Sequence, residues 1–103
     1  MKSRQIVFSP EAQDDLIALY DWIADAASPP IAMAYINPIE AFCVSLSTAS
    51  ERGRARDDIR PGLRIIGFEK RLTVAFLVTE KRVTLLRLFY GGQDWEGVLA
   101  EED

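Results

Sequence analysis

The sequence contains no histidine and only one cysteine, Cys43, among its 103 residues. Without histidine, neither histidine-based acid–base catalysis nor histidine ligation of a metal is available. A single cysteine cannot form an internal disulfide, which is typical of proteins of the reducing cytosol. Cys43 itself falls on an apolar helical stripe, so we expect a small buried side chain. We therefore expect a cytoplasmic protein with no metal and no cofactor.

Long hydrophobic runs are also missing. The apolar stretch Val74–Val78 has the length of a strand, and no apolar stretch approaches the roughly 18 residues that cross a membrane. The segment from Met1 to Phe8 has two basic residues but no apolar run, so we expect no secretory signal. With 103 residues, 49% of them hydrophobic and 27% charged, the chain has room for one hydrophobic core. We predict a single domain over residues 1–103.

The charge is distributed unevenly along the chain. The formal net charge is −4, yet residues 51–71 hold seven basic and four acidic side chains. A general nucleic-acid binder is normally basic overall, so we expect no direct binding to nucleic acid. The basic segment has two interpretations: a surface for one acidic partner, or an ordinary solvated loop.

Two helices are predicted in the N-terminal half. Ser9-Pro10-Glu11 is a strong helix start, with Ser9 as the N-cap and Pro10 at the first helical position. Ser28-Pro29-Pro30 ends this helix and starts a second one, which should run from about Pro30 to Ser50. Because the link is short, the two helices should form an antiparallel hairpin. Pro38 lies inside the second helix, where we expect a kink or a local break near Met33–Asn37.

The apolar residues of both helices recur at helical spacing and should face the core. We expect Tyr20, Tyr35 and Phe42 to be core residues. The complete stripes are Ala12, Leu16, Leu19, Tyr20, Ile23 and Ala27 in the first helix, and Ile31, Tyr35, Ile39, Phe42, Cys43 and Leu46 in the second.

Extended structure is predicted on both sides of the helical hairpin. Arg4–Phe8 reads as a short strand, and three later runs are rich in β-branched and aromatic residues. These runs are joined by short polar turns, so they should form an antiparallel meander: Leu63–Phe68, Leu72–Thr79 and Arg82–Tyr90. The last run is apolar on both faces, which indicates a central position in the sheet.

The end of the chain and the order of the elements complete the predicted fold. Asp94 can cap a last helical turn that ends at Leu99. The predicted class is α+β, in the order β-α-α-β-β-β: a two-helix hairpin packed on an antiparallel sheet, with a short C-terminal helical turn.

Three segments carry a family resemblance: FSPEAQDDLIALYDWIA (Phe8 to Ala24), RPGLR (Arg60 to Arg64) and RLFYGGQDW (Arg87 to Trp95). In this order they resemble the RelE/ParE toxin superfamily, and its ParE-like toxins of type II toxin–antitoxin systems in particular. The match spans nearly the whole chain. The resemblance implies the fold described above and the function of a toxin that a cognate ParD-like antitoxin neutralises.

One branch of the superfamily cleaves mRNA on the ribosome, using sheet-borne basic residues with a C-terminal arginine and tyrosine. Aligned through Gly91, the arginine position is Gln93 here and the tyrosine position is Leu99. Glutamine brings no charge to a scissile phosphate, and leucine can neither stack nor exchange a proton. The sequence fits the ParE branch better, which acts by binding and usually targets DNA gyrase. We predict no catalytic residue. The alternatives are a RelE-like ribosome-dependent mRNA endonuclease and an inactive member that retains only antitoxin binding.

The resemblance implies that an antitoxin segment packs on the helical hairpin and reaches the sheet. Trp22, on the flank of the first helix stripe, is either an anchor for that segment or a boundary residue that covers the core edge. Met33 and Val44 lie opposite the core stripe of the second helix. Arg64 and Arg71 carry guanidinium groups that suit the carboxylates of an acidic segment, and they complete the predicted antitoxin-binding set.

The predicted binding site for the target, DNA gyrase, consists of Arg60, Arg64, Arg87 and Trp95. The resemblance implies that the arginines line one functional face of the sheet. In the alternative interpretation, two of them, Arg64 and Arg87, only form surface ion pairs, with Asp57, Asp58 or Glu69.

Overall fold

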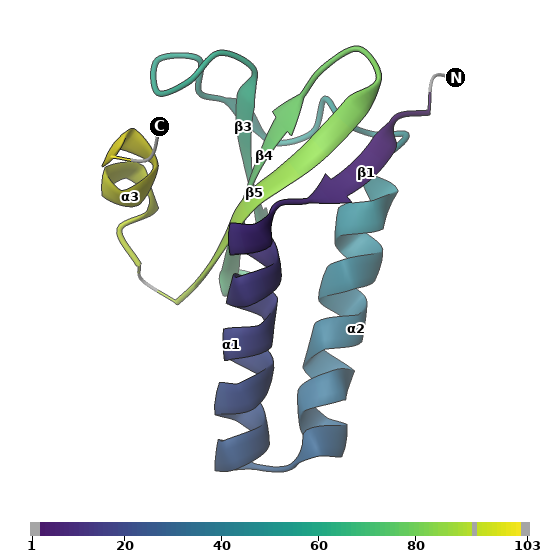
Figure 1. Cartoon of the computed structure of the whole chain (residues 1–103), viewed down its shortest axis with the longest axis vertical. Coiled ribbons are helices and arrows are strands. Elements are labelled where there is room, and N and C mark those ends of the chain that lie inside the picture. The colour runs from purple at the N-terminus through teal and green to yellow at the C-terminus, as the bar shows by residue number, and fades with distance from the viewer. Residues whose placement is uncertain (1–2, 92, 102–103) are drawn as a thin grey trace.

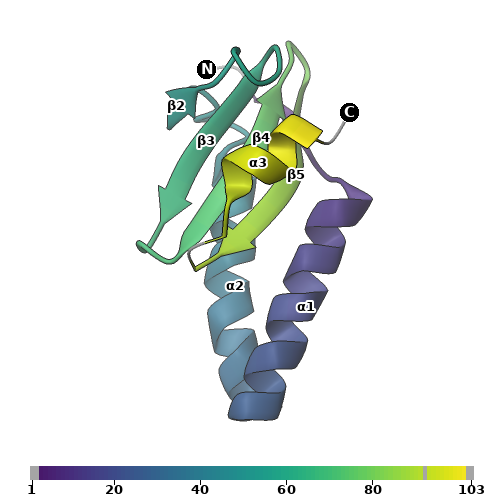
Figure 2. The same ribbon diagram turned by 90° about the vertical axis from the view of Figure 1, so that its left-hand side faces the viewer.

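The computed structural model describes residues 3–91 and 93–101. In this range two helices form an antiparallel hairpin against one face of a sheet, and a third short helix lies over the opposite face (Figure 1 and Figure 2). The elements in chain order are β1 (Gln5–Phe8), α1 (Pro10–Ala26), α2 (Pro29–Ser45), β2 (Arg54–Ala55), β3 (Leu63–Phe68), β4 (Leu72–Val78), β5 (Arg82–Tyr90) and α3 (Trp95–Glu101). The predicted α+β class and element order are confirmed, with the two-residue β2 as an addition.

The sheet has the strand order β1-β5-β4-β3-β2. The antiparallel meander of β3, β4 and β5 is confirmed, and β5 lies in the interior of the sheet as its two apolar faces indicated. The sheet as a whole is mixed, because β1 pairs with β5 in parallel, from Gln5 opposite Arg82 to Phe8 opposite Leu85. Parallel neighbours need a long connection, and the helical hairpin followed by the meander provides one.

Both predicted helix starts are confirmed by their caps. The Ser9 hydroxyl accepts the Ala12 N–H at 3.0 Å, and the Ser28 hydroxyl accepts the Ile31 N–H at 3.4 Å. Of the kink or local break expected near Met33–Asn37, the break is wrong, since α2 is continuous from Pro29 to Ser45. Proline removes one backbone bond here, and the buried Ile36 and Ile39 on either side hold the turn against the core. The predicted end near Ser50 is also wrong, because the helix ends at Ser45.

The main core lies between the helical hairpin and the sheet. In α1 the predicted stripe is confirmed at Ala12, Leu19 and Ile23, which are buried. In α2 the buried line is Ala32, Ile36, Ile39 and Cys43, so the prediction of Ile31 and Tyr35 as core residues is wrong. The small Ala32 lets α2 pack closely against its neighbours, so Ala32 and Ile36 face the core in place of Ile31 and Tyr35, which are exposed. Tyr20 and Phe42 are half-buried at its edge.

A second, smaller core lies on the opposite face of the sheet, beneath α3. Its buried members are Leu63, Ile65, Ala75, Phe89 and Leu99. The Asp94 carboxylate accepts the Gly97 N–H at 3.1 Å, as expected for the cap of this helix. The predicted C-terminal turn is therefore a helix that adds a partial third layer to the predicted two.

Candidate protein-binding surfaces

The tip of the helical hairpin projects beyond the sheet, so the strands do not cover it (Figure 1). In the described part of the chain, every exposed large hydrophobic side chain belongs to α1 or α2. The exposed fractions are 58% for Ile17, 60% for Trp22, 40% for Met33 and 42% for Tyr35, and Ile31 and Val44 are also exposed. Single exposed apolar residues are ordinary, but their concentration on one projecting element is typical of an interaction surface.

A groove of about 360 Å³ runs between the two helices. This inter-helix groove is lined by Gln13, Leu16, Ile17, Tyr20, Met33, Ile36 and Glu40. Of the residues predicted to bind the antitoxin, Met33 lies in it. Ile17 was missed, although its apolar side chain next to the α1 stripe was the available signal.

Trp22 and Val44 lie outside the inter-helix groove. The Trp22 ring packs at 5.8 Å from the Tyr90 ring, on a hollow of about 240 Å³ between α1 and β5. Trp22 thus covers the core edge with one side of its ring and still presents most of its surface to solvent. Val44 is exposed toward the opposite end of α2 from Met33. The predicted antitoxin-binding residues are therefore spread over several parts of the surface.

Arg64 is engaged with the backbone that leads into β2. Its guanidinium donates to the carbonyl oxygens of Glu51 at 2.6 Å, Arg52 at 3.0 Å and Gly53 at 3.2 Å. Gly53 has φ of +79°, and a Cβ there would collide with the Ile65 carbonyl. The predicted ion pair of Arg64 with a nearby acid is therefore wrong, because this side chain fastens a tight loop instead.

Arg87 forms an ion pair with Asp15 of α1. Arg87 Nε and one terminal nitrogen donate to the two Asp15 oxygens at 2.8 and 3.1 Å. The Leu88 N–H donates to the same carboxylate at 2.8 Å. Both side chains are largely buried, with exposed fractions of 20% for Arg87 and 17% for Asp15. The acid predicted to pair with Arg87 was wrong, since the partner comes from the first helix.

Beyond the end of β1, side chains take over the hydrogen bonding of the β5 backbone, and Asp15 of this ion pair is one of them. The Ser9 hydroxyl donates to the Leu86 carbonyl at 2.9 Å, Asp15 accepts the Leu88 N–H, and the Gln93 side-chain oxygen accepts the Tyr90 N–H at 2.8 Å. These bonds occupy backbone groups that an added strand would need. At the other edge of the sheet, β2 pairs only with Arg64 and Ile65.

Trp95 is half-buried beneath the Arg56 side chain, whose guanidinium lies 5.4 Å from the indole ring. Arg56 also pairs with Asp58 at 2.9 Å and with Glu96 of α3 at 2.8 Å. The hydrogen bond to Asp58, and to a smaller extent the one to Glu96, raises the pKa of Arg56. The same guanidinium lowers the pKa of Asp58. Arg56 thus fastens α3 to the loop before β3. Arg60, in this loop, is exposed.

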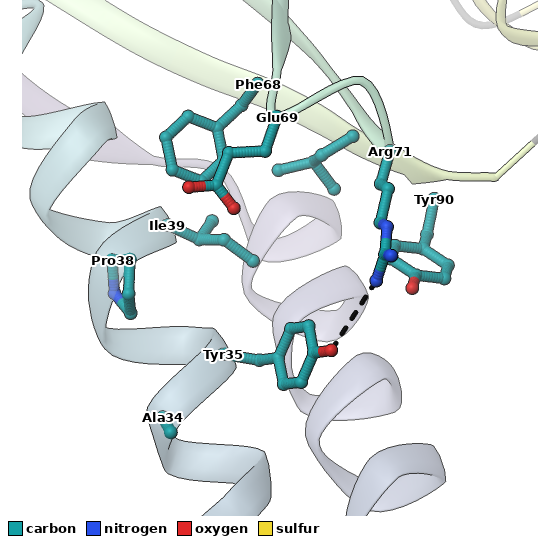
Figure 3. A pocket seen from close by; sticks show the side chains of 9 residues that line it. Ala34, Tyr35, Pro38, Ile39, Phe68, Glu69, Arg71 and Tyr90 are labelled. Carbon is teal, nitrogen blue, oxygen red and sulfur yellow. Dashed lines mark hydrogen bonds between the residues drawn. The ribbon is translucent and has the colours of Figure 1, made fainter.

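Arg71 lies in a pocket of about 540 Å³ between α2 and the turn that joins β3 to β4, which we call the Arg71 pocket (Figure 3). One terminal nitrogen of Arg71 donates to the Tyr35 hydroxyl at 3.5 Å. Hydrogen bonding to Tyr35, with a further contribution from Tyr90, raises the pKa of Arg71. The sequence predicted a role for Arg71 but missed both tyrosines. The pocket is lined by Ala34, Tyr35, Pro38, Ile39, Phe68, Glu69, Arg71, Leu72 and Tyr90.

The positions that align with the nuclease residues have structural partners. Leu99 is buried in the second core, and Gln93 is bonded to the Tyr90 N–H. Among residues 3–91 and 93–101, no three histidine, cysteine or acidic side chains are grouped to hold a metal ion. Over the same residues, no helix combines the length and apolar character that a membrane span requires.

The fold is shared with chains of two solved toxin–antitoxin systems. A chain of the chromosomal ParDE system from P. aeruginosa superposes with a TM-score of 0.74 at 23% identity, over 86% of this chain and 97% of that one. A chain of the RelBE2 toxin–antitoxin complex from Mycobacterium tuberculosis gives a TM-score of 0.61 at 16% identity, over 85% and 98%. No curated protein matches the sequence.

The sequence itself specifies the family. The family model described as the ParE toxin of the type II toxin–antitoxin system parDE matches residues 6–95. The chain belongs to the ParE toxin family.

Proposed function

We propose that this chain is a toxin that binds and inhibits DNA gyrase in the bacterial cytoplasm, without cleaving RNA, and that a cognate ParD-like antitoxin neutralises it. The observation that carries the proposal is the projecting helical hairpin with its exposed apolar side chains and its groove. Membership of the ParE toxin family supports the same role. The similarity in fold to chains of toxin–antitoxin systems supports an antitoxin partner.

The inter-helix groove is the proposed main antitoxin site. Ile17 and Met33 are exposed on its two walls, from α1 and α2, while Gln13 and Glu40 supply a polar rim. An amphipathic helix that lays its apolar face into such a groove buries these side chains from water. A second, extended part of the antitoxin would add to the sheet beside β3, beyond the two residues that β2 covers. The β5 edge is a poorer place, because Asp15 and Gln93 occupy its backbone groups.

Two of the four residues predicted to bind the target, Arg64 and Arg87, are engaged in contacts within the chain. Arg60 is exposed and can contact a target directly. Trp95 offers a partly exposed edge close to the same loop. Arg64 and Arg87 act as positioning residues, because their guanidinium groups are bonded to the chain itself.

The target is tested with purified protein in a gyrase supercoiling assay and by inducing the chain in cells. We expect inhibition of supercoiling and growth arrest with a DNA-damage response, both relieved by the product of the adjacent small gene. Normal supercoiling at a large molar excess of folded protein would overturn the choice of gyrase.

A ribosome-dependent mRNA endonuclease is the second candidate. It is favoured by the fold shared with the RelBE2 chain and by the basic segment 51–71. The two functions separate in one experiment, which maps transcript ends by primer extension after induction. Cuts inside translated codons would establish the nuclease. Antitoxin binding without any growth arrest would identify an inactive member.

The antitoxin site is tested by placing a charge in the groove. Replacing Ile17 by glutamate should weaken antitoxin binding at least about thirtyfold, because a carboxylate would be buried against apolar contacts. Ile31→Glu is the matched control, since Ile31 is also exposed on the helical hairpin but lies outside the groove. Calorimetric titration of both variants gives the affinities. Equal losses in the two variants would move the antitoxin site away from the inter-helix groove.

A further inference from the structure

The Arg71 pocket brings hydrogen-bond donors together on one side. The Arg71 guanidinium lies between the Tyr35 hydroxyl and the Tyr90 ring, as Figure 3 shows. A guanidinium has five N–H groups, and a tyrosine hydroxyl can also donate. Within the described residues Arg71 has no carboxylate partner, in contrast to Arg56 and Arg87. Arg71 is therefore a guanidinium without an ion-pair partner among these residues, in a pocket that the Glu69 carboxylate also lines.

The walls next to this charge are apolar. Phe68, Ile39 and Leu72 line the pocket beside Arg71, and the Pro38 ring forms part of its rim. A volume of about 540 Å³ is within the range of small-ligand sites and has room for two amino-acid side chains. The pocket thus fits an acidic group that is attached to an apolar neighbour.

Hydrogen-bond acceptors lie away from Arg71. Pro38 has no N–H, so the Ala34 carbonyl receives no hydrogen bond from position 38. Ala34 lines the same pocket. The Glu69 carboxylate is turned toward Phe68 and Ile39, away from the guanidinium (Figure 3). A peptide backbone could donate to these acceptors while its acidic side chain reaches Arg71.

We propose that the Arg71 pocket is a second peptide site, which receives an acidic side chain next to an apolar one from the antitoxin segment. The arrangement of donors at Arg71, apolar walls and acceptors near Pro38 selects a peptide of this kind. The inference rests on the proposed antitoxin partner, but its test measures binding directly and does not depend on toxicity.

Charge argues against a phosphate-rich occupant. The chain has a net charge of −4, and Glu69 adds a negative charge to the pocket itself. A polyanion would meet this repulsion along its whole length, whereas a single carboxylate meets the guanidinium alone. A carboxylate also matches the planar fork of arginine with two parallel hydrogen bonds.

The probes are the peptide Ac-Leu-Glu-Leu-NH2, its glutamine counterpart Ac-Leu-Gln-Leu-NH2, and inorganic phosphate, each titrated by NMR into the full chain. We expect the acidic peptide to bind saturably in the millimolar range and to shift the ring signals of Tyr35 and Tyr90. Loss of one charge-assisted contact corresponds to about tenfold or more in affinity, so the glutamine peptide and the Arg71→Gln variant should each show that loss. Tyr35→Phe should bind a few-fold more weakly.

The control is Arg82→Gln, which removes the same charge from an exposed position outside the pocket and should leave binding unchanged. Arg71 and Tyr35 are both exposed, so their variants should keep the dispersed amide spectrum of the folded chain. Equal affinity for the acidic and the glutamine peptides would overturn the proposal. Phosphate that binds as tightly as the acidic peptide and displaces it would overturn it as well, leaving only a general anion site. A chain without toxicity that passes the titration would refute the proposed function and leave this inference intact.

Discussion

Replacement of Asp15 by alanine removes a carboxylate that accepts hydrogen bonds from both the Arg87 side chain and the Leu88 backbone of β5. It accepts two hydrogen bonds from Arg87 and one from the Leu88 N–H, all between 2.8 and 3.1 Å. Hydrogen bonds to charged groups contribute about 1.5–3 kcal/mol each, and breaking a buried ion pair costs about 3–5 kcal/mol. The pair here retains some exposure, and water can reach the released Arg87 in part. We therefore expect Asp15→Ala to lower the free energy of unfolding by about 3 kcal/mol.

Urea denaturation followed by circular dichroism measures this loss, which is a large share of the about 5–15 kcal/mol that stabilises a typical domain. Asp15→Asn keeps an oxygen for the Leu88 N–H but loses the charge, so it should lose about half as much. Asp14→Ala is the control, because Asp14 is the adjacent carboxylate on α1 and is exposed. In a double-mutant cycle with Arg87→Ala the pair should show a coupling of at least about 1 kcal/mol. A loss below about 0.5 kcal/mol for Asp15→Ala would refute the structural role of this carboxylate.

Four further predictions concern the turn between β3 and β4, the Cys43 thiol, for which there are two, and the loop that Arg64 holds. Glu69 and Lys70 have positive φ angles of 52° and 62°, which asparagine and glycine tolerate better than other residues. The double substitution Glu69→Asn with Lys70→Gly should therefore raise the free energy of unfolding by about 1–2 kcal/mol, measured by thermal denaturation. Unchanged stability would contradict backbone strain at this turn. Burial, with a smaller effect of Glu40, raises the pKa of Cys43 to about 12, so a thiol reagent at pH 8 should modify it only after unfolding, and rapid reaction of the folded chain would contradict this burial. The folded state binds the Cys43 thiol proton more tightly than the unfolded state, so the raised pKa contributes to the free energy of unfolding. In urea titrations this contribution should be fully present below the ordinary pKa of 9.0 and should be lost as the pH rises toward 12. Arg64→Lys should speed hydrogen exchange around Gly53 by about tenfold, because an ammonium cannot replace a guanidinium bonded to three carbonyls, and unchanged exchange would contradict that role.

Local signals in the sequence were sufficient for the helices and the meander. Serine followed by proline defined both helix starts, and the capping bonds of Ser9 and Ser28 are the physical cause. The strand boundaries Leu63–Phe68 and Arg82–Tyr90 followed from apolar runs that short turns separate. The parallel pairing of β1 with β5 could not be predicted in this way, because it joins segments far apart in the sequence and has no local pattern.

The candidate sites were less predictable, because they depend on which helix side faces the core. Helical spacing allowed two apolar lines in α2, and the sequence favoured the one with the larger side chains, which includes Tyr35. Because Ala32 is small, the other line packs against the core, and Tyr35 is left exposed beside Arg71 in the pocket. Tyr90 was similarly hidden from prediction, since its neighbours Trp22 and Arg71 come from other elements.

The contacts that the arginines make within the chain limit which partners the basic segment can bind. Arg56 and Arg64 hold loops, and Arg87 holds a helix to a strand, so three guanidinium groups bind the chain's own carboxylates or carbonyls. A surface that reads nucleic acid needs several such groups facing solvent together. Five basic side chains of segment 51–71 are exposed, but they lie on different elements. Arg52 stacks over the Phe42 ring, Arg54 lies in β2, Arg60 lies in the loop before β3, and Lys70 and Arg71 lie at the turn between β3 and β4. Separate charges of this kind suit individual carboxylates of a protein partner, so salt should weaken antitoxin binding only modestly, whereas a steep salt dependence would indicate a phosphate backbone as the ligand.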